Sequence, residues 1–121
     1  MSDRTVVLIV NPPGELQIGL QALLTTHLDV DVLVVSEVSS ALKVIIQNKP
    51  TLIILDQDIS RNDIKEVVKI IKSKWTDLLC MVLVNDDHNR QEIIEEGADL
   101  VVIKGLKGAK LVDTIKGLLG T

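Results

Sequence analysis

The chain has 121 residues, the length of one ordinary domain, and a formal net charge of −4 at pH 7. This acidic balance argues against nucleic-acid binding by the segment alone, because neutralising a phosphate backbone requires a basic surface. Hydrophobic residues make up 46% of the chain but aromatic residues only 1%, so the core must be packed with aliphatic side chains.

The amino terminus shows no targeting or membrane-spanning segment, since the apolar run at residues 5–10 is too short to cross a bilayer. We therefore expect a cytoplasmic protein in a reducing compartment. One cysteine and two histidines cannot form a disulfide framework or a cysteine–histidine metal cluster. Cys80, inside the apolar run at residues 78–84, is expected to be an inert core thiol.

The first half of the chain alternates short apolar runs with segments of helical spacing. Residues 5–10 form the first predicted strand, which ends at residues 11–14 because the two prolines there have no amide proton to donate. A helix follows, then a strand at residues 30–35, then a helix capped by Ser36 or Ser39. The side chains expected to face inward are Leu16, Leu20, Leu23 and Leu24 in the first helix, and Val38, Ala41, Leu42 and Ile45 in the second.

The stretch at residues 52–55 is the centre of the predicted sheet. Four consecutive aliphatic residues run directly into Asp56. Such a run, rich in β-branched residues and without polar alternation, is typical of a strand covered on both faces. Asp56 would then lie at the carboxyl end of the strand, where open α/β sheets place their ligands.

The second half repeats the alternation. Asp63 is expected to cap the third helix with Glu66 as its capping-box partner. Strands are predicted at residues 78–84 and 100–103, separated by a short helix that opens at residues 85–87. That helix is expected to close at Gly97, and a last helix follows Gly108. The short helix carries Ile93 and Ile94. The apolar helical faces expected in the other two helices are Ile64, Val67, Val68 and Ile71, and Leu111, Ile115, Leu118 and Leu119, whereas Lys65, Lys69 and Lys72 are expected to form a solvated helix face.

Five strand–helix units in succession predict one doubly wound domain over residues 1–121, with a parallel sheet, helices on both faces and right-handed crossovers. The carboxyl ends of parallel strands share one edge of the sheet. This edge should gather Asn11, Asp56, Asn85 and Lys104. An acid with a lysine reaching toward it is a specific arrangement at such an edge.

The sequence resembles the receiver domain of two-component response regulators over essentially the whole chain. Residues 8–24 are similar to the opening strand, acidic turn and first helix of that family, and residues 19–24 look most like receivers that precede helix-turn-helix output domains. Asp56 matches the phosphoacceptor, and residues 96–104 match the segment that ends in the family's lysine, here Lys104. The resemblance implies a flavodoxin-like (βα)5 fold, a five-stranded parallel sheet with strand order 2-1-3-4-5.

The resemblance also implies a phosphorylation switch. A histidine kinase would donate a phosphoryl group to Asp56, a divalent ion would neutralise charge, and Lys104 would pair with the phosphoryl oxygens. The family's acidic metal-binding pair falls on Asn11 and Pro12, so two negative charges are missing. One charge at contact distance is worth about 4 kcal/mol at an effective dielectric of 20. We therefore expect a Mg²⁺ site that is weak or absent, with Asp56, Asp58 and Asn11 as its available ligands.

Other positions depart from the family pattern as well. The hydroxyl residue that usually follows the fourth strand is missing, which leaves Asn85 as the candidate for contacting the phosphoryl group beside Lys104. The usual aromatic of the fifth strand corresponds to Val101, and the proline after the lysine is replaced by Gly105. No bistable element is evident that a phosphoryl group would bias.

We therefore predict an atypical, degenerate receiver, a signalling and protein-interaction module and not an enzyme. Its partners would be a histidine kinase, an output protein or a second copy, bound through the fourth helix, fifth strand and fifth helix. Leu100 and Leu106 are each either apolar contacts of that face or core residues. Two hypotheses remain open: weak phosphoryl acceptance at Asp56, or docking that is independent of phosphorylation, which we favour. The alternative is a haloacid-dehalogenase-like phosphatase that uses Asp56 as nucleophile and Asp58 as acid/base. Against it, the Asp-x-Asp signature follows the third strand and not the first.

Overall fold

The computed structural model describes residues 4–59 and 63–120, and in this part of the chain five strands alternate with five helices as predicted. None of the helices in this part is long and apolar enough to cross a membrane. The strands are β1 (Thr5–Val10), β2 (Val30–Val35), β3 (Leu52–Asp56), β4 (Leu79–Val84) and β5 (Leu100–Ile103). The helices are α1 (Glu15–His27), α2 (Val38–Asn48), α3 (Ile64–Lys74), α4 (Arg90–Glu95) and α5 (Gly108–Leu119).

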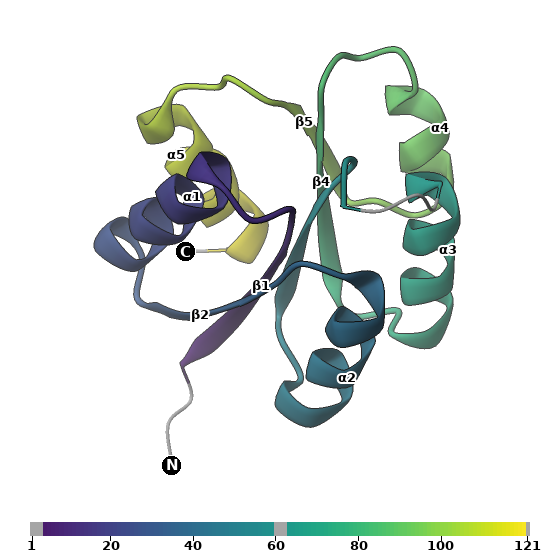
Figure 1. The fold of residues 1–121 in the computed structure, drawn as a ribbon, viewed down its shortest axis with the longest axis horizontal. Helices are drawn as coiled ribbons and strands as arrows, with labels where there is room; N and C mark the ends of the chain where they lie inside the picture. Colours follow the sequence, from purple (N-terminus) through teal and green to yellow (C-terminus); the bar gives the residue numbers. More distant parts are fainter. Residues whose placement is uncertain (1–3, 60–62, 121) are drawn as a thin grey trace.

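The strands form one parallel sheet in the order β2-β1-β3-β4-β5, which confirms the predicted topology (Figure 1). Its register aligns the carboxyl ends of the central strands: Asp56 lies beside Leu83, and Ile103 lies beside Val84. The backbone N–H of Lys104 then donates to the carbonyl oxygen of Val84 at 2.8 Å. The sheet thus carries Asp56 and Lys104 to the same edge.

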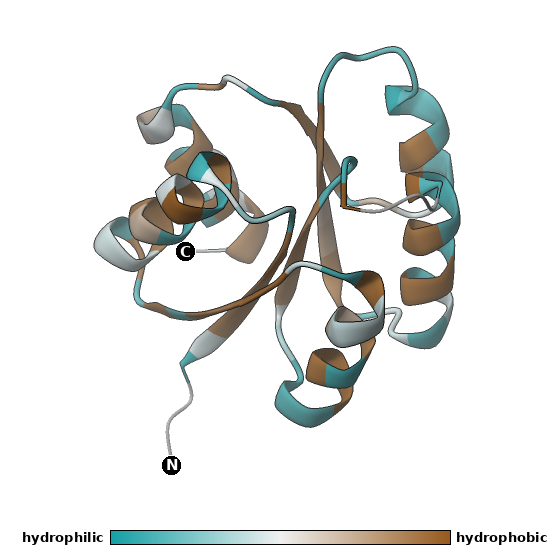
Figure 2. Cartoon of the chain, viewed as in Figure 1, coloured by the Kyte–Doolittle hydropathy of each residue, from teal (hydrophilic) through white to brown (hydrophobic). Residues whose placement is uncertain are grey.

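The sheet divides the aliphatic core into two clusters. Helices α1 and α5 cover one face, and α2, α3 and α4 cover the other (Figure 1). Along β3, Ile53 and Leu55 pack with the α2–α4 side, whereas Leu52 and Ile54 pack with the α1–α5 side. Every residue of β3 is buried, as an uninterrupted apolar run predicts, and the strands are accordingly the most uniformly hydrophobic elements in Figure 2.

Helix starts differ from the sequence prediction. Helix α2 has Glu37 as its N-cap residue and no side-chain cap hydrogen bond, so neither Ser36 nor Ser39 caps it. Asp63 does cap α3, but its carboxylate accepts from the backbone N–H of Lys65 at 3.0 Å and not from that of the predicted partner. A cap depends on where the chain leaves the preceding strand or loop, which side-chain preference alone does not determine.

The start of α4 is also later than predicted. The helix begins at Arg90 after Asn89, so residues 85–87 do not open it. Instead, the carboxylate of Asp86 accepts from the backbone N–H of His88 at 2.9 Å within the loop. The predicted end is confirmed, because Gly97 follows the last residues of α4 with φ 119°.

The lysine row of α3 is not simply solvated, as the sequence pattern suggested. Lys65 Nζ lies 2.8 Å from the carboxylate of Glu92, and Lys72 Nζ lies 3.0 Å from that of Asp99. Lys72 also donates to the carbonyl oxygen of Leu78 at 2.8 Å. These contacts join α3 to α4 and to the start of β5. Leu16, which helical spacing placed inward, is exposed.

Candidate functional site

The polar residues predicted to gather at the carboxyl edge of the sheet do lie there. Asp56 is the last residue of β3, and Asn11, Asn85 and Lys104 directly follow β1, β4 and β5. The Asp56 side chain is only 3% exposed, and Asn11 is equally buried. Each is carried to this edge by an apolar strand whose own side chains are packed on both sides.

Lys104 bridges two carboxylates. Its Nζ lies 2.6 Å from Oδ1 of Asp56 and 2.9 Å from Oδ2 of Asp58. Burial alone would lower the pKa of Lys104, but its hydrogen bonds to Asp56 and Asp58 outweigh burial and raise that pKa. The lysine is therefore firmly protonated, and it neutralises one of the two carboxylate charges.

Asp58 is tied to both neighbouring loops. Its two carboxylate oxygens accept from Nδ2 of Asn85 at 3.2 and 3.1 Å, and its backbone N–H donates to Oδ1 of Asp56 at 2.8 Å. The hydrogen bond from Lys104, and then that from Asn85, lower the pKa of Asp58. Asn85, predicted as a phosphoryl contact, thus places its amide on Asp58 in this structure.

Gln57 is a member of the site that sequence reasoning missed. Its side-chain Oε1 accepts from the backbone N–H of Asn85 at 2.6 Å, and its own backbone N–H donates to the carbonyl oxygen of Leu83 at 2.9 Å. It therefore holds the loop after β4 against the end of β3. The only sequence signal was its place directly after Asp56, which says nothing of the direction of its side chain.

Asn11 lies at the same edge but outside this network. Within residues 4–59 and 63–120, neither its Oδ1 nor its Nδ2 has a hydrogen-bond partner. Its main-chain carbonyl accepts from Nε2 of Gln17 at 3.1 Å, which ties the start of α1 to the end of β1. The structure therefore brings together Asp56, Asp58, Asn85 and Lys104, but it does not join Asn11 to them by a side-chain contact.

Comparison with known proteins identifies the arrangement. The family model of the response regulator receiver domain matches residues 7–116. The chain belongs to this family. No curated protein matches it.

Solved receivers share the fold at low sequence identity. A two-component response regulator from Clostridium difficile is 23% identical with a TM-score of 0.86, and the match covers 96% of both chains. A CheY-like receiver domain protein from Methanospirillum hungatei is 16% identical with a TM-score of 0.88, covering 98% of this chain and 95% of that one. A LuxR-family response regulator from Aurantimonas is 16% identical with a TM-score of 0.87, covering 98% and 86%.

Receiver domains are signalling modules of two-component systems that interact with kinases and output domains. Nothing in the fold or in the family match supports the haloacid-dehalogenase alternative. Its second carboxylate, Asp58, is already held by Lys104 and Asn85.

The residues at this receiver's edge are a poor fit for the family's divalent ion. In the part of the chain that the structure describes, no three acidic, histidine or cysteine side chains lie close enough together to hold a metal. Both nearby carboxylates already contact Lys104, and Asn11 offers a neutral amide oxygen. Hard cations bind chiefly through carboxylate oxygens, and the two carboxylates of this donor set are already engaged by the Lys104 ammonium, which competes with a cation for them.

The predicted interaction face of the receiver is partly apolar. Leu106 and Ile103 are exposed, and so is Ile94 on α4. Of the two leucines for which surface contact and core were both left open, Leu100 packs against the core cluster on the α1–α5 side. Ile103 was not predicted for this face, because a short apolar strand gives no sign of which residue will be uncovered.

Proposed function

We propose that this receiver works as an interaction module of two-component signalling, without a metal-dependent phosphoryl switch at Asp56. The observation that carries the proposal is the bridge from Lys104 to Asp56 and Asp58, at 2.6 and 2.9 Å. The two carboxylates and the one ammonium group leave a net charge of −1, which attracts a divalent cation only weakly. With acids at positions 11 and 12, as in the family pattern, the edge would be more negative.

Access to Asp56 supports the same proposal. Its side chain is 3% exposed, and Oδ1 already accepts from Lys104 Nζ and from the backbone N–H of Asp58. Both hydrogen bonds are accepted by one of the two carboxylate oxygens, and among the described residues Lys104 is the cation that contacts Asp56 and is available to offset the charge of an incoming phosphate. Weak phosphoryl acceptance at Asp56 is therefore the less favoured of the two hypotheses.

The test is the intact mass of the chain after incubation with acetyl phosphate, with and without Mg²⁺. We expect no adduct that depends on both Mg²⁺ and Asp56, from a chain that circular dichroism shows to be folded. The matched gain-of-function variant is Asn11→Asp with Pro12→Asp, which restores the missing acids and should gain a Mg²⁺-dependent adduct. Asp56→Asn in that background should remove it. An adduct on the native chain that requires Mg²⁺ and is lost in Asp56→Asn would refute the proposal.

In this proposal the partners are proteins: a kinase, an output protein, or a second copy that meets the face formed by α4, β5 and α5. The exposed Ile103 and Leu106 provide its apolar contacts. The module would act in the cytoplasm, and it would have no enzymatic activity of its own. Sedimentation of Ile103→Glu beside the native chain tests the self-pairing form, since a native dimer should dissociate in the variant.

A further inference from the structure

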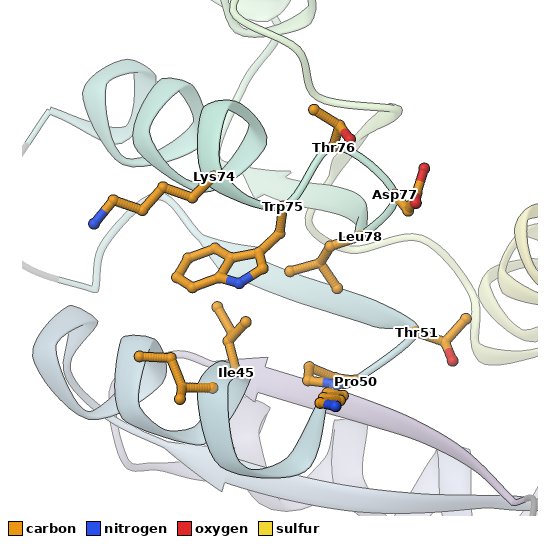
Figure 3. A pocket seen from close by; sticks show the side chains of 10 residues that line it. Ile45, Pro50, Thr51, Lys74, Trp75, Thr76, Asp77 and Leu78 are labelled. Carbon is orange, nitrogen blue, oxygen red and sulfur yellow. The ribbon is translucent and has the colours of Figure 1, made fainter.

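Two hollows lie end to end between α2 and α3, on the opposite side of the molecule from the α1–α5 layer. One has a volume of about 300 Å³ and lies between the first halves of the two helices. The other, of about 610 Å³, lies between their last turns (Figure 3). The lining residues of α2 run from Val38 to Lys49 and those of α3 from Asp63 to Lys74. On each helix they recur at the spacing of a single helical face. The two hollows are therefore halves of one groove, the α2–α3 groove.

The groove is apolar along its length and is only partly covered. Ile46 is 65% exposed and Ile70 is 45% exposed, and each lines one of the hollows. Trp75, the sole aromatic residue of the chain, follows α3, and its indole lies between the two helices with Ile45 beneath it (Figure 3). An uncovered apolar strip of this kind, rimmed by charge, is typical of a surface that binds a partner.

The charges on the rim differ in sign between the two ends. Helices α2 and α3 each connect two parallel strands of the sheet, so they run in the same direction. Their N-terminal ends therefore lie at one end of the groove and their C-terminal ends at the other. Asp63 and Glu66 line the end where α3 begins. Lys49 and Lys74 line the end where the helices finish, and with Asp77 beside them they leave one net positive charge there. Counted over the residues that the structure describes, the groove therefore has an acidic end and a basic end.

We infer that the α2–α3 groove receives an amphipathic helix of a partner protein, lying antiparallel to α2 and α3. The first turn of that helix carries acidic residues against Lys49 and Lys74, and its last turn carries basic residues against Asp63 and Glu66. Its apolar stripe covers Ile46 and Ile70 of the groove. An acidic first turn and a basic last turn also complement the partner's own dipole, so the segment that fits the groove is one that readily forms a helix. Three turns, about 16 Å, match the length of α2.

This inference rests on the proposed function, because it names a partner for the interaction module, but neither hollow is lined by Asp56, Asp58, Asn85 or Lys104. Its basic end adjoins Pro50 and Thr51, just before β3, whereas Asp56 ends that strand. The acidic end lies toward the carboxyl edge, because α2 and α3 begin after the carboxyl ends of β2 and β3, but no residue of α4, β5 or α5 lines either hollow. The receiver is thus able to hold a groove partner and a partner on the α4–β5–α5 face together.

Trp75 provides the readout for the test. The probe is a 14-residue peptide without aromatic residues, with Glu in its first turn, Leu and Ile at helical spacing, and Lys in its last turn. The control peptide has Glu and Lys exchanged, and both peptides are held helical by a crosslink on the polar face. We expect saturable quenching or shift of Trp75 emission by the first peptide, and at least tenfold weaker binding of the second. Equal binding of the two, or no change in emission with either up to millimolar concentration, would overturn the inference.

Matched variants locate the binding site. Ile46→Glu and Ile70→Glu change exposed side chains, so they should fold normally and weaken binding of the first peptide at least tenfold. Ile18→Glu, at a position on α1 that is 67% exposed, should leave it unchanged. Equal effects of Ile18→Glu and Ile70→Glu would refute the site. A concentration-dependent dimer of the native chain that is lost in Ile46→Glu but kept in Ile18→Glu would also overturn the inference, because the occupant would then be a second copy.

The peptide titration is repeated on Asp56→Asn, where unchanged affinity is expected. Since the mass measurement at Asp56 uses no peptide and the titration uses no phosphodonor, either proposal is able to fail while the other stands.

Discussion

Replacing Lys104 with Met removes the cation that lies 2.6 Å from the Asp56 carboxylate while keeping an unbranched side chain that is one atom shorter. At that distance and an effective dielectric of 20, the attraction is about 6 kcal/mol before desolvation is subtracted. Breaking a buried pair typically costs about 3–5 kcal/mol, because it leaves an uncompensated charge. Asp56 is 3% exposed but Lys104 is 20% exposed, so we expect a loss near the lower end, about 3 kcal/mol. The contact with the well-exposed Asp58 adds little.

The assay is urea unfolding at pH 7 followed by far-ultraviolet circular dichroism. The double variant Lys104→Met with Asp56→Asn removes the stranded charge, so it should regain at least half of the lost free energy of unfolding. Lys69→Met, at an exposed lysine of α3, is the matched control and should stay within about 0.5 kcal/mol of the native chain. A loss below about 1 kcal/mol for Lys104→Met, or a double variant no more stable than the single one, would refute this reasoning.

Three further predictions test other parts of the structure. The hydrogen bond from Lys104 lowers the pKa of Asp58 in the folded chain. The charged carboxylate therefore stabilises the fold above the ordinary pKa of an aspartate, about 4, and this stabilisation is lost as the pH falls through the lowered pKa of the folded chain. Asp58→Asn should therefore flatten the acid limb of the urea midpoint against pH, and an unchanged limb would contradict the assignment. Burial raises the pKa of the Cys80 thiol to about 12, so Ellman's reagent at pH 8 should react only after unfolding, and reaction of the folded chain within minutes would disprove its burial. Gly97 has φ 119°, which side chains rarely adopt, and a Cβ added there would lie 3.1 Å from Cβ and Cγ of Lys72. Gly97→Ala should therefore lower the free energy of unfolding in urea by about 1–3 kcal/mol. An unchanged urea midpoint would show that the turn relaxes freely.

The order and type of the elements could be predicted because each strand is a short apolar run bounded by polar or proline-containing turns. The strand at 52–55 is the clearest example, and the observed β3 extends it only to include Asp56. The strand order came from the family resemblance. Once the order is given, the meeting of Asp56 and Lys104 follows from parallel register alone.

The remainder of the site depends on loop conformations that a pattern does not encode. The contacts of Asp58 with Asn85 and of Gln57 with the same loop join residues about 28 positions apart. Likewise, the spacing of Lys65 and Lys72 shows one helical face but not the acidic side chains that α4 and β5 bring beside it. Side-chain pairs that depend on loops and on neighbouring helices were therefore missed, while the pair formed by Asp56 and Lys104 at the strand ends was correctly placed.

The division of the core by the sheet has a consequence for how the sequence can vary. Ile53 and Ile54 are neighbours in the chain, yet they belong to separate half-cores with different packing partners. If a substitution at Ile53 removes a methylene, the cavity can be filled only by a larger side chain in the same cluster, for example at Val67 or Ile71. A larger side chain beside Ile54 is on the other face of the sheet and cannot fill it. Compensating substitutions should thus be confined to one side. The two clusters are therefore able to accumulate substitutions independently of each other, while the strand backbones between them keep their hydrogen bonds.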